Sequence, residues 1–365
     1  MGIYDKQHPF LAKIKERKLL NQEGSTKKTY HIVLDLSGAN LRYKVGDAFA
    51  VFPTNPSDLV GELLDRLQLS GAEQFTDPRR QQKTFLYDFL SHRVDLMRTP
   101  HKLVKLVGQQ AAQKELPPNH GTDLATFFTR CNSQNIPLHE LVRCFAPLLP
   151  RFYSIASSQA VVGEEGHLLV ATFSYEQEGK KRRGIGSQFL CEDAVIGKTP
   201  IPLYLQPSRD FTLPANPMTP ILMIGPGTGV APYRGFLQQR YHERAPGKNW
   251  LIFGERHRSF DYYYRSFFET LEKEQFLRTS TAFSRDQATK FYVQHCLFQH
   301  AAEVWQWLEK EKAQVYICGD KNSMAKAVMA AFLSIIQKEG RLSELGAKTY
   351  FKQLRKEKRF LLDVY

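Results

Sequence analysis

The chain has 365 residues, 42% of them hydrophobic and 12% aromatic, and a formal net charge of +13. This length and composition indicate a globular protein of roughly two domains, with a third possible within the length. No run approaches the roughly 18 consecutive apolar residues of a membrane span, and the start lacks a signal peptide and has Lys6 where a myristoylation signal requires Ser or Thr, so we expect a cytoplasmic protein.

The charge and the cysteines narrow the kinds of site. A net positive charge is compatible with binding to nucleic acid, an anionic membrane surface, an acidic protein or phosphate-rich cofactors. The charge alone does not distinguish among these ligands. The five cysteines are far apart: Cys131, Cys144, Cys191, Cys296 and Cys318. Without a C-x-x-C pair or a Cys/His pair at ligand spacing, we expect neither a disulfide framework nor a metal site. Hydrolase motifs such as H-E-x-x-H and G-x-S-x-G do not occur either.

The first half alternates short β-branched or aromatic segments with Gly, Pro, Asn and Asp turns. The segments cover residues 29–37, 43–53, 151–158, 166–177 and 199–208. This pattern predicts an antiparallel β-barrel built from residues 8–54 and 144–214. Residues 55–143 interrupt it with helical spacing over 57–69, 85–96, 101–116 and 123–131, and Ser57 and Asp123 are candidate N-caps. We therefore expect a barrel with a helical insertion.

The second half, residues 216–365, alternates buried strands with longer amphipathic segments. Strands are predicted over 220–225, 249–254, 277–284, 314–320 and the closing 360–365. Helices are predicted over 231–244, 261–275, 293–312, 322–340 and 343–359, and Gly340 ends the fourth. Such alternation is typical of a five-stranded parallel sheet with helices on both faces.

The segment "MIGPGTGVAPYRGF" (223–236) joins the first of these strands to its helix. Gly225, Gly227 and Gly229 allow a tight turn whose free N–H groups can meet a pyrophosphate at the positive end of the helix, and Thr228 adds a hydroxyl. The spacing is G-x-G-x-G without a Lys-Ser/Thr pair, which disfavours a P-loop kinase or ATPase. The alternative is a glycine-rich turn that binds nothing.

The third strand of this half ends in "FSRDQATKFYVQ". Ser284, Arg285 and Lys290 offer one hydroxyl and two cations, which suit the 2′-phosphate of NADP, and Tyr292 could stack on adenine. The alternative is a solvated loop with ordinary charges.

The barrel carries a second set of phosphate-type features. In "RFYSIASS" (151–158) the strand period of two places Arg151 and Tyr153 on one face, while Ser154 turns the other way or lies at a bend. Downstream, "RRGIGSQFL" (182–190) is another glycine-bearing turn before a helix. Two such loops in two domains predict two nucleotides across one cleft, the arrangement that hydride transfer between cofactors requires. Cys318, at the end of the fourth strand, is by default a buried structural cysteine.

The motifs RFYSIASS, GIGSQFL, MIGPGTGVAPYRGF, FSRDQ, KFYVQ, YICGDKNSMAKAV and DVY, in this order, are similar to those of the ferredoxin–NADP reductase-like module of the diflavin reductases. The sulfite reductase [NADPH] flavoproteins are the branch that the motifs resemble most. The resemblance covers nearly the whole chain and implies an FAD-binding barrel, a connecting helical domain and a Rossmann-like NADP-binding α/β domain. From this resemblance we expect a module without the FMN domain that precedes it in full-length members. Ile185 and Gly186 stand where relatives prefer Gly-Ala.

The resemblance also implies site residues. FAD would be bound by Arg151, Phe152, Tyr153, Ser154, Leu169, Val170, Ala171, Tyr175, Gly184, Ile185, Gly186, Ser187 and Tyr365. NADPH would be bound by Gly227, Thr228, Gly229, Ser284, Arg285, Lys290, Phe291, Tyr292, Val293 and Gln294. Hydride transfer would take place beside Ser154, Cys318 and Asp363, with the ring of Tyr365 as a removable lid on the flavin.

The implied function is an NADPH-dependent FAD oxidoreductase that passes single electrons to a separate carrier. We expect an acidic flavodoxin-like FMN protein or the sulfite reductase hemoprotein as that carrier, steered by the positive charge. A general ferredoxin or flavodoxin reductase outside sulfur metabolism is the alternative enzyme. A non-catalytic basic module that binds nucleic acid is the alternative of another class.

Overall fold

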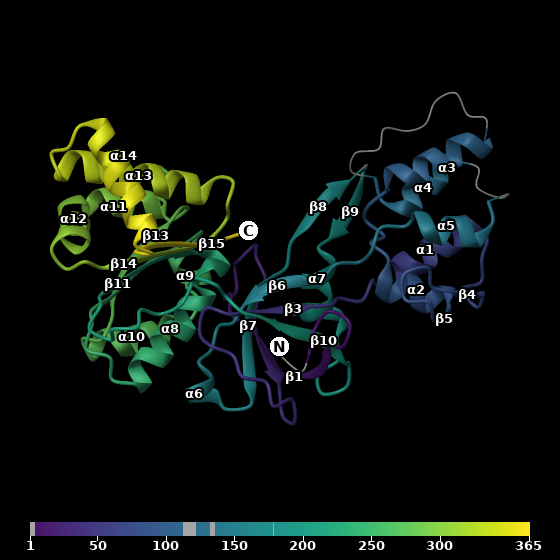
Figure 1. Cartoon of the computed structure of the whole chain (residues 1–365), viewed down its shortest axis with the longest axis horizontal. Helices are drawn as coiled ribbons and strands as arrows, with labels where there is room; N and C mark the ends of the chain where they lie inside the picture. The colour runs from purple at the N-terminus through teal and green to yellow at the C-terminus, as the bar shows by residue number, and fades with distance from the viewer. Residues whose placement is uncertain (1–3, 112–121, 132–135, 178) are drawn as a thin grey trace.

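The computed structural model describes residues 4–111, 122–131, 136–177 and 179–365. Three parts follow one another across the molecule: a helical part, a central barrel and an α/β part (Figure 1). The antiparallel barrel with a helical insertion, followed by an α/β domain with a five-stranded parallel sheet, is the predicted fold class, which is confirmed. The domain boundaries given above stay a prediction.

The barrel is a six-stranded antiparallel sheet. Its strands lie in the order β6 (Arg151–Ser154), β3 (Ala48–Val51), β10 (Ile201–Gln206), β1 (Phe10–Leu19), β2 (Thr29–Asp35) and β7 (Glu165–Ala171). Ile155, directly after β6, pairs with Leu168 of β7, so the two edges of the sheet meet and the barrel closes.

The sequence analysis missed strand β1. In this strand the buried Ala12 and Ile14 alternate with the exposed Lys13 and Lys15. The pattern is hard to recognise in the sequence because the strand has few buried residues and many charged ones. The other segments predicted for the barrel form strands, and residues 166–177 divide into β7 and β8 (Ser174–Gln177).

The helical insertion contains five helices within the described residues: α1 (Ser57–Leu67), α2 (Leu86–Arg93), α3 (His101–Ala111), α4 (Leu124–Arg130) and α5 (Leu138–Cys144). A small hairpin of β4 (Gln74–Thr76) and β5 (Lys83–Phe85) precedes α2. Asp123 caps α4 as predicted, since its carboxylate accepts from the Thr126 N–H at 2.8 Å. The Ser57 cap was wrong: Pro56 occupies the N-cap position and no side chain caps α1. The end of the helix predicted over 101–116 lies outside the described residues.

Short elements lead from the barrel to its second glycine turn. They are α6 (Gln159–Val162), the hairpin of β8 and β9 (Lys180–Arg183), and α7 (Ile185–Gln188), which continues as a π-helical turn over Phe189–Asp193. Arg182 of β9 donates to Asp123 at 2.7 Å and pairs with Glu62, so ion pairs tie the hairpin to the insertion.

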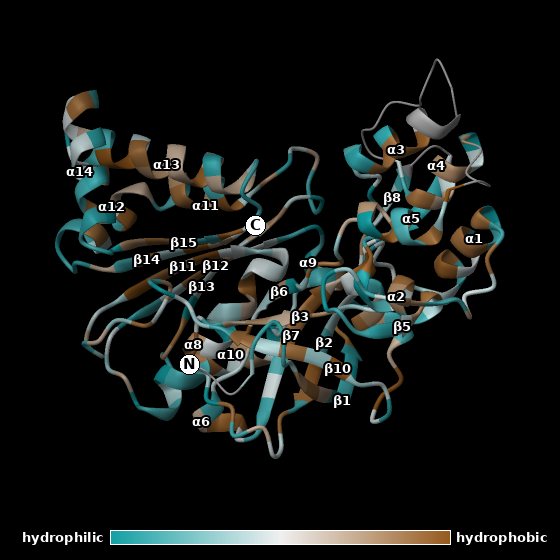
Figure 2. Ribbon diagram, turned by 45° about the vertical axis from the view of Figure 1, so that its right-hand side comes forward, coloured by the Kyte–Doolittle hydropathy of each residue, from teal (hydrophilic) through white to brown (hydrophobic). Residues whose placement is uncertain are grey.

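The parallel sheet has the order β13 (Arg278–Phe283), β12 (Asn249–Glu255), β11 (Ile221–Pro226), β14 (Gln314–Gly319) and β15 (Phe360–Val364). Helices α8 (Ala231–His242) and α10 (Arg265–Lys273) cover one face, and α11 (Val293–Gln299), α12 (Ala301–Glu309), α13 (Met324–Glu339) and α14 (Glu344–Lys356) cover the other (Figures 1 and 2). Because both faces are covered, the strands are apolar on both sides: Met223 faces the α8 layer and Leu222 the α13 layer.

Two predicted helices are interrupted. The segment 261–275 becomes the short α9 (Arg258–Asp261) and α10, because Tyr264 between them adopts a left-handed φ of +57°. The segment 293–312 divides at His300 into α11 and α12.

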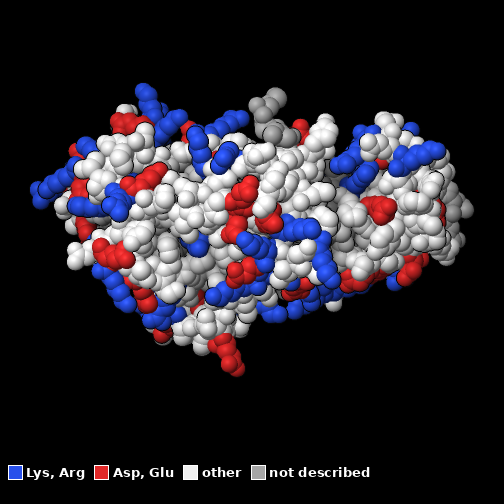
Figure 3. Space-filling view, turned by 90° about the horizontal axis from the view of Figure 1, so that it is seen from below, with Lys and Arg blue, Asp and Glu red and all other residues white. Residues whose placement is uncertain are grey.

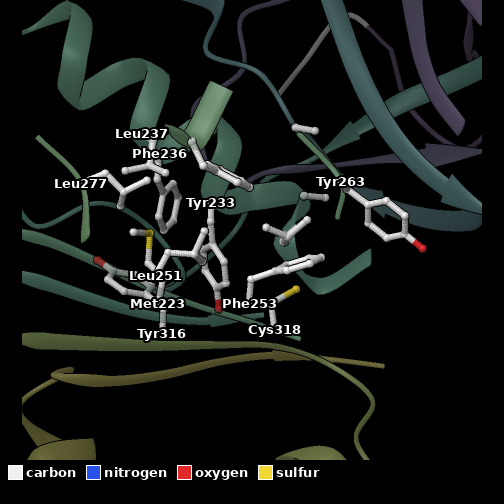
Figure 4. Packing of buried hydrophobic residues seen from close by; sticks show 14 of the residues in the cluster. Met223, Tyr233, Phe236, Leu237, Leu251, Phe253, Tyr263, Leu277, Tyr316 and Cys318 are labelled. Carbon is white, nitrogen blue, oxygen red and sulfur yellow. The ribbon is translucent and has the colours of Figure 1, made fainter. Parts of the chain in front are cut away.

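The α8 face of the sheet and the barrel share one hydrophobic core. Tyr233 and Phe236 of α8 pack on Met223 and Tyr316 of the sheet (Figure 4), and the same cluster includes Ala156 from the barrel. The two halves are therefore packed together rather than merely linked. In the part of the chain that the structure describes, no helix has the length and apolar character needed to span a membrane.

Candidate functional site

A cavity of about 650 Å³ lies where the barrel meets the α/β half. Its barrel side is formed by β6, the end of β7, the β8–β9 hairpin and the turn into α7, and Thr228, Ala231 and Tyr365 come from the α/β half. All thirteen residues predicted for FAD line it. The volume lies within the range of ordinary cofactor pockets.

Glycines shape the barrel side of this first cavity. A Cβ at Gly186 would lie 2.7 Å from the Tyr153 hydroxyl and 2.8 Å from Arg151 Cγ, so both side chains face the glycine turn, as the strand period predicted. A Cβ at Gly184 would meet the ring of Phe173 at 2.2 Å. The two glycines of the turn therefore place no side chain on the side that faces Arg151, Tyr153 and Phe173.

That arrangement fits the flavin nucleotide. The N–H groups at the start of α7 suit a pyrophosphate, and the guanidinium of Arg151 adds positive charge. Phe173 is 60% exposed and stacks on Tyr175 with ring centroids 6.3 Å apart, which leaves an aromatic face open in the cavity. The sequence analysis missed Phe173, Asp95 and Met97 in this cavity, although an exposed aromatic pair directly after a strand was a usable signal for Phe173.

Ser154, Cys318 and Asp363 come together beside the cavity, although only Ser154 lines it. The Ser154 hydroxyl donates to Asp363 Oδ2 at 2.8 Å, and the Cys318 thiol donates to the same oxygen at 3.7 Å. Cys318 and Asp363 are paired residues on neighbouring strands β14 and β15, while Ser154 ends β6 of the barrel. Complete burial, and next to it the charge of Asp363, raises the pKa of the Cys318 thiol well above its usual value. The thiol is therefore protonated and neutral.

Tyr365 is anchored through its main chain and keeps its ring exposed. Its N–H donates to the Gly319 carbonyl at 3.2 Å, and its own carbonyl accepts from the Lys321 N–H at 3.0 Å. The hydroxyl is hydrogen-bonded to Thr228 Oγ1 at 2.9 Å, and the residue is 63% exposed along the cavity. A ring held this way is not part of the core.

A second cavity, of about 510 Å³, lies at the carboxyl ends of β11 to β14. Five residues predicted for NADP line it: Gly227, Ser284, Tyr292, Val293 and Gln294. The others lie elsewhere. Thr228 faces the first cavity, Lys290 and Phe291 line a separate open hollow, Gly229 packs under the loop, and Arg285 donates its main-chain N–H to Arg256.

Close backbone approach explains two of the loop glycines. A Cβ at Gly229 would lie 2.1 Å from the Cys318 carbonyl oxygen, and one at Gly225 would lie 2.5 Å from the Gly229 carbonyl oxygen. A Cβ at Gly227 would make only an ordinary contact, 3.6 Å from Glu255 Oε1, but the φ of +58° favours glycine for a different reason. The loop therefore packs tightly against β14.

The second cavity also contains residues that the sequence analysis missed. These are Pro226, Gly254, Glu255, Arg256, Ala282, Asp320, Ser323, Met324 and Ala327. The polar ones lie at or within four residues of the ends of strands β12 and β14, and that position alone could have suggested them. Hydrogen bonds from Ser323 and from the Met324 N–H hold the pKa of Asp320 well below its usual range, so this carboxylate caps the start of α13.

All five cysteines are free thiols, and among the described residues no group of His, Cys, Asp and Glu side chains could hold a metal ion. The two cavities, rather than a metal centre, are thus the candidate site. Consecutive residues, Gly227 and Thr228, line one cavity each, so the glycine loop is the wall between them.

Comparisons with known proteins agree with this geometry. Residues 3–104 and 71–189, which together span just over half of the chain, match the family described as FAD binding domain, and residues 223–330 match the oxidoreductase NAD-binding domain. The "Sulfite reductase [NADPH] flavoprotein alpha-component" of Mannheimia succiniciproducens is 38% identical over 99% of this chain and 62% of its own length. The proteins of the same name from Vibrio cholerae and Bacillus subtilis are 37% and 35% identical, over 60% and 62% of their lengths.

The chain thus spans about three fifths of the length of these curated relatives. The first family match covers the insertion and the barrel except β10, and the second covers the parallel sheet except β15 and ends within α13. The chain therefore belongs to the FAD-binding domain family, here joined to an oxidoreductase NAD-binding domain.

Proposed function

We propose that the chain is an NADPH-dependent flavoprotein reductase that carries reducing equivalents from NADPH through FAD to a separate one-electron carrier. One observation carries this proposal. A cavity suited to a flavin nucleotide and a cavity at the strand ends of the parallel sheet share the glycine loop as a wall, beside the cluster of Ser154, Cys318 and Asp363. Relatives at 35 to 38% identity are named for an NADPH flavoprotein, which supports the same conclusion.

When bound, FAD would accept a hydride from NADPH and release the two electrons one at a time. The chain's own residues would hold the two nucleotides. Arg151 and the N–H groups of residues 184–187 would bind the flavin nucleotide, and the glycine loop with Ser284 and Tyr292 would bind the other. Tyr365 would cover the flavin until the nicotinamide ring replaces its side chain.

The cluster around Asp363 has a defined electrostatic role in this proposal. Both hydrogen-bond donors to Asp363, the Ser154 hydroxyl and the Cys318 thiol, are neutral, so the cluster places the negative charge of the carboxylate beside the cavity. A fixed negative charge favours a neighbouring ring on which positive charge develops as hydride leaves. The cluster therefore stabilises the oxidised nicotinamide and orients it by packing.

We also propose a preference for NADPH over NADH, resting on Ser284, Arg285 and Lys290. Only Ser284 lines the second cavity, so the two cations would have to turn toward a bound 2′-phosphate. Equal kcat/KM values for NADPH and NADH would contradict this assignment. In the variant Lys290→Ala the preference should fall about tenfold or more, as expected for loss of one charge-assisted phosphate contact.

The electron carrier is proposed to be an acidic flavodoxin-like FMN protein or the sulfite reductase hemoprotein, and the location to be the cytoplasm. The net charge of +13 supports an acidic partner. Lysine and arginine side chains are interspersed with acidic ones on the face shown in Figure 3 rather than forming one basic field there. Electron transfer to a flavodoxin should slow with added salt, and a rate independent of ionic strength would refute the steering argument.

The test of the function begins with the purified chain. It should be yellow, contain FAD, and reduce ferricyanide with NADPH. Asp363→Asn should keep bound FAD but slow flavin reduction about 100-fold in stopped-flow absorbance, because the fixed charge is lost. Cys296→Ala is the control, since Cys296 is a buried residue of the same α/β half that lines neither cavity. A colourless protein without NADPH turnover would refute the proposed function.

A further inference from the structure

A loop of the barrel reaches the second cavity from outside the α/β half. This loop, residues 20–28, connects β1 to β2 and lies on residues 255–264 after β12. Asn21 and Ser25 donate to Asp261 Oδ1 at 2.7 and 2.6 Å, and the Gln22 N–H donates to the Phe260 carbonyl at 2.9 Å. Asp261 is 1% exposed, so these bonds fix the loop firmly on the α/β half.

The loop delivers a lysine to a carboxylate in the cavity wall. Lys27 forms an ion pair with Glu255 Oε1, and Glu255 Oε2 accepts from the Arg256 N–H at 2.7 Å. The side chain of Glu255 is only 4% exposed and that of Lys27 is 24% exposed. Next to this pair, Arg256 donates to Thr26 of the same loop at 2.8 Å. The barrel thus contacts two residues that line the second cavity.

Glu255 stands where a nucleotide phosphate would approach. A Cβ built on Gly227, in the loop proposed to bind the pyrophosphate, would lie 3.6 Å from Glu255 Oε1. The Glu255 carbonyl also accepts from the Ser284 N–H at 2.8 Å, which places Glu255 beside the residue assigned to the 2′-phosphate. A bare carboxylate here would repel both groups, because like charges in a partly buried site are weakly screened.

The position of Glu255 in the fold is also unfavourable for binding a 2′-phosphate. Glu255 is the last residue of β12, which follows β11 in the chain and is therefore the second strand of the parallel sheet in chain order. In dinucleotide-binding folds, an acidic residue after the second strand favours a free ribose 2′-hydroxyl over a 2′-phosphate. Left unpaired, Glu255 would therefore oppose NADP more strongly than NAD.

We infer that Lys27 masks the charge of Glu255, so that a loop of the flavin-binding half sets the affinity and phosphate selectivity of the nicotinamide nucleotide cavity. This inference rests on the proposed function of the second cavity. Glu255 is the specificity-determining residue, and Lys27 is a positioning residue that acts through it. Nucleotide recognition by the α/β half would consequently depend on the barrel even where no barrel atom contacts the nucleotide.

The experiment measures Kd values of NADP⁺ and NAD⁺ by isothermal titration calorimetry on the FAD-containing protein. Lys27→Met should weaken NADP⁺ binding about tenfold, equivalent to about 1.4 kcal/mol, and weaken NAD⁺ binding less. Lys28→Met is the matched control, because this neighbouring lysine is exposed and lines neither cavity, and its Kd should stay within about twofold of the unmodified protein. The double variant Lys27→Met/Glu255→Gln should recover NADP⁺ binding to within about threefold.

Each outcome decides one question. If the unmodified protein binds neither nucleotide, the proposed function fails. If it binds NADP⁺ but Lys27→Met behaves like Lys28→Met, the masking role is refuted. If the double variant is as weak as Lys27→Met, Lys27 acts directly on the nucleotide and masking is also refuted. Should Lys27→Met not fold, Glu255→Gln alone still tests the inference, because it must bind NADP⁺ at least as tightly as the unmodified protein.

Discussion

Replacing Gly229 by alanine should separate the glycine loop from β14. The added Cβ would lie 2.1 Å from the Cys318 carbonyl oxygen and 2.8 Å from its carbon, whereas ordinary contacts begin at 3.4 Å. The loop or the strand must therefore move by more than 1 Å, and neither is a flexible side chain that could turn away. Overpacking of this kind costs about 1 to 3 kcal/mol, and two main-chain segments place Gly229→Ala near 3 kcal/mol.

Gly227→Ala is the matched comparison in the same loop. Its φ of +58° costs an alanine about 1 to 2 kcal/mol, but the new methyl group meets Glu255 Oε1 only at an ordinary contact distance of 3.6 Å. An argument from φ alone would rank Gly227→Ala as the worse change, whereas close approach ranks Gly229→Ala as the worse. The two variants therefore separate the two physical causes.

Urea unfolding followed by tryptophan fluorescence measures this difference. All three tryptophans, Trp250, Trp305 and Trp307, lie in the α/β half, so the signal reports on the part of the molecule that contains the loop. Gly229→Ala should lower the free energy of unfolding more than Gly227→Ala and should also displace Cys318 from Asp363, slowing flavin reduction by NADPH. Equal midpoints for Gly229→Ala and the unmodified protein would refute the argument from close approach.

Deleting Tyr365 should leave the urea midpoint nearly unchanged, because the ring is 63% exposed, and should change flavin fluorescence and NADP⁺ affinity; a large loss of stability would instead make the residue part of the core. Gly61→Ala in α1 should raise the free energy of unfolding by about 0.5 to 1 kcal/mol in urea melts, since the new Cβ meets no atom within 4 Å. Burial, followed by the nearby Arg234 and His167, lowers the pKa of His31 to about 3. The unfolded chain therefore binds a proton at His31 near pH 6.5, which the folded chain does not take up until about pH 3. As the pH is lowered through this window, the free energy of unfolding should fall by up to about 1.4 kcal/mol per pH unit. His31→Gln should flatten this dependence in urea melts between pH 6 and pH 4, and an unchanged slope would contradict the assignment.

Several residues of the candidate site could be found from their position, because they lie at the end of a buried strand or in a glycine turn, as Gly227, Ser284 and Cys318 do. Because parallel strands end at a common edge, the ends of β11 and β14 were expected to be neighbours. Asp363 and Ser154 were assigned to the same place only through the family resemblance. Most of the predicted site residues line one of the two cavities, whereas Arg285, Lys290, Phe291, Gly229, Cys318 and Asp363 line neither.

Contacts between distant segments were not predictable in the same way. Lys27 and Glu255 are separated by most of the chain, one in a loop of the barrel and the other at the end of β12, and no periodicity in either segment connects them. Strand β1 was missed because its buried residues are few and its charges many, and the break between α9 and α10 depends on the φ of Tyr264, a residue type with no preference for that conformation.

The shared core under α8 has a consequence for how this protein can be taken apart. Val45, Ala156 and Leu169 of the barrel belong to the same buried cluster as Tyr233 and Phe236 of α8, and Asp261 depends on donors from the barrel loop. Cutting the chain between its sheets would expose apolar surface on both pieces and remove both barrel donors to the buried carboxylate of Asp261, which would keep the His257 N–H as a donor. The two nucleotide-binding halves are consequently not interchangeable modules, and a chimera with another member of the family must exchange the loop and the α8 face together.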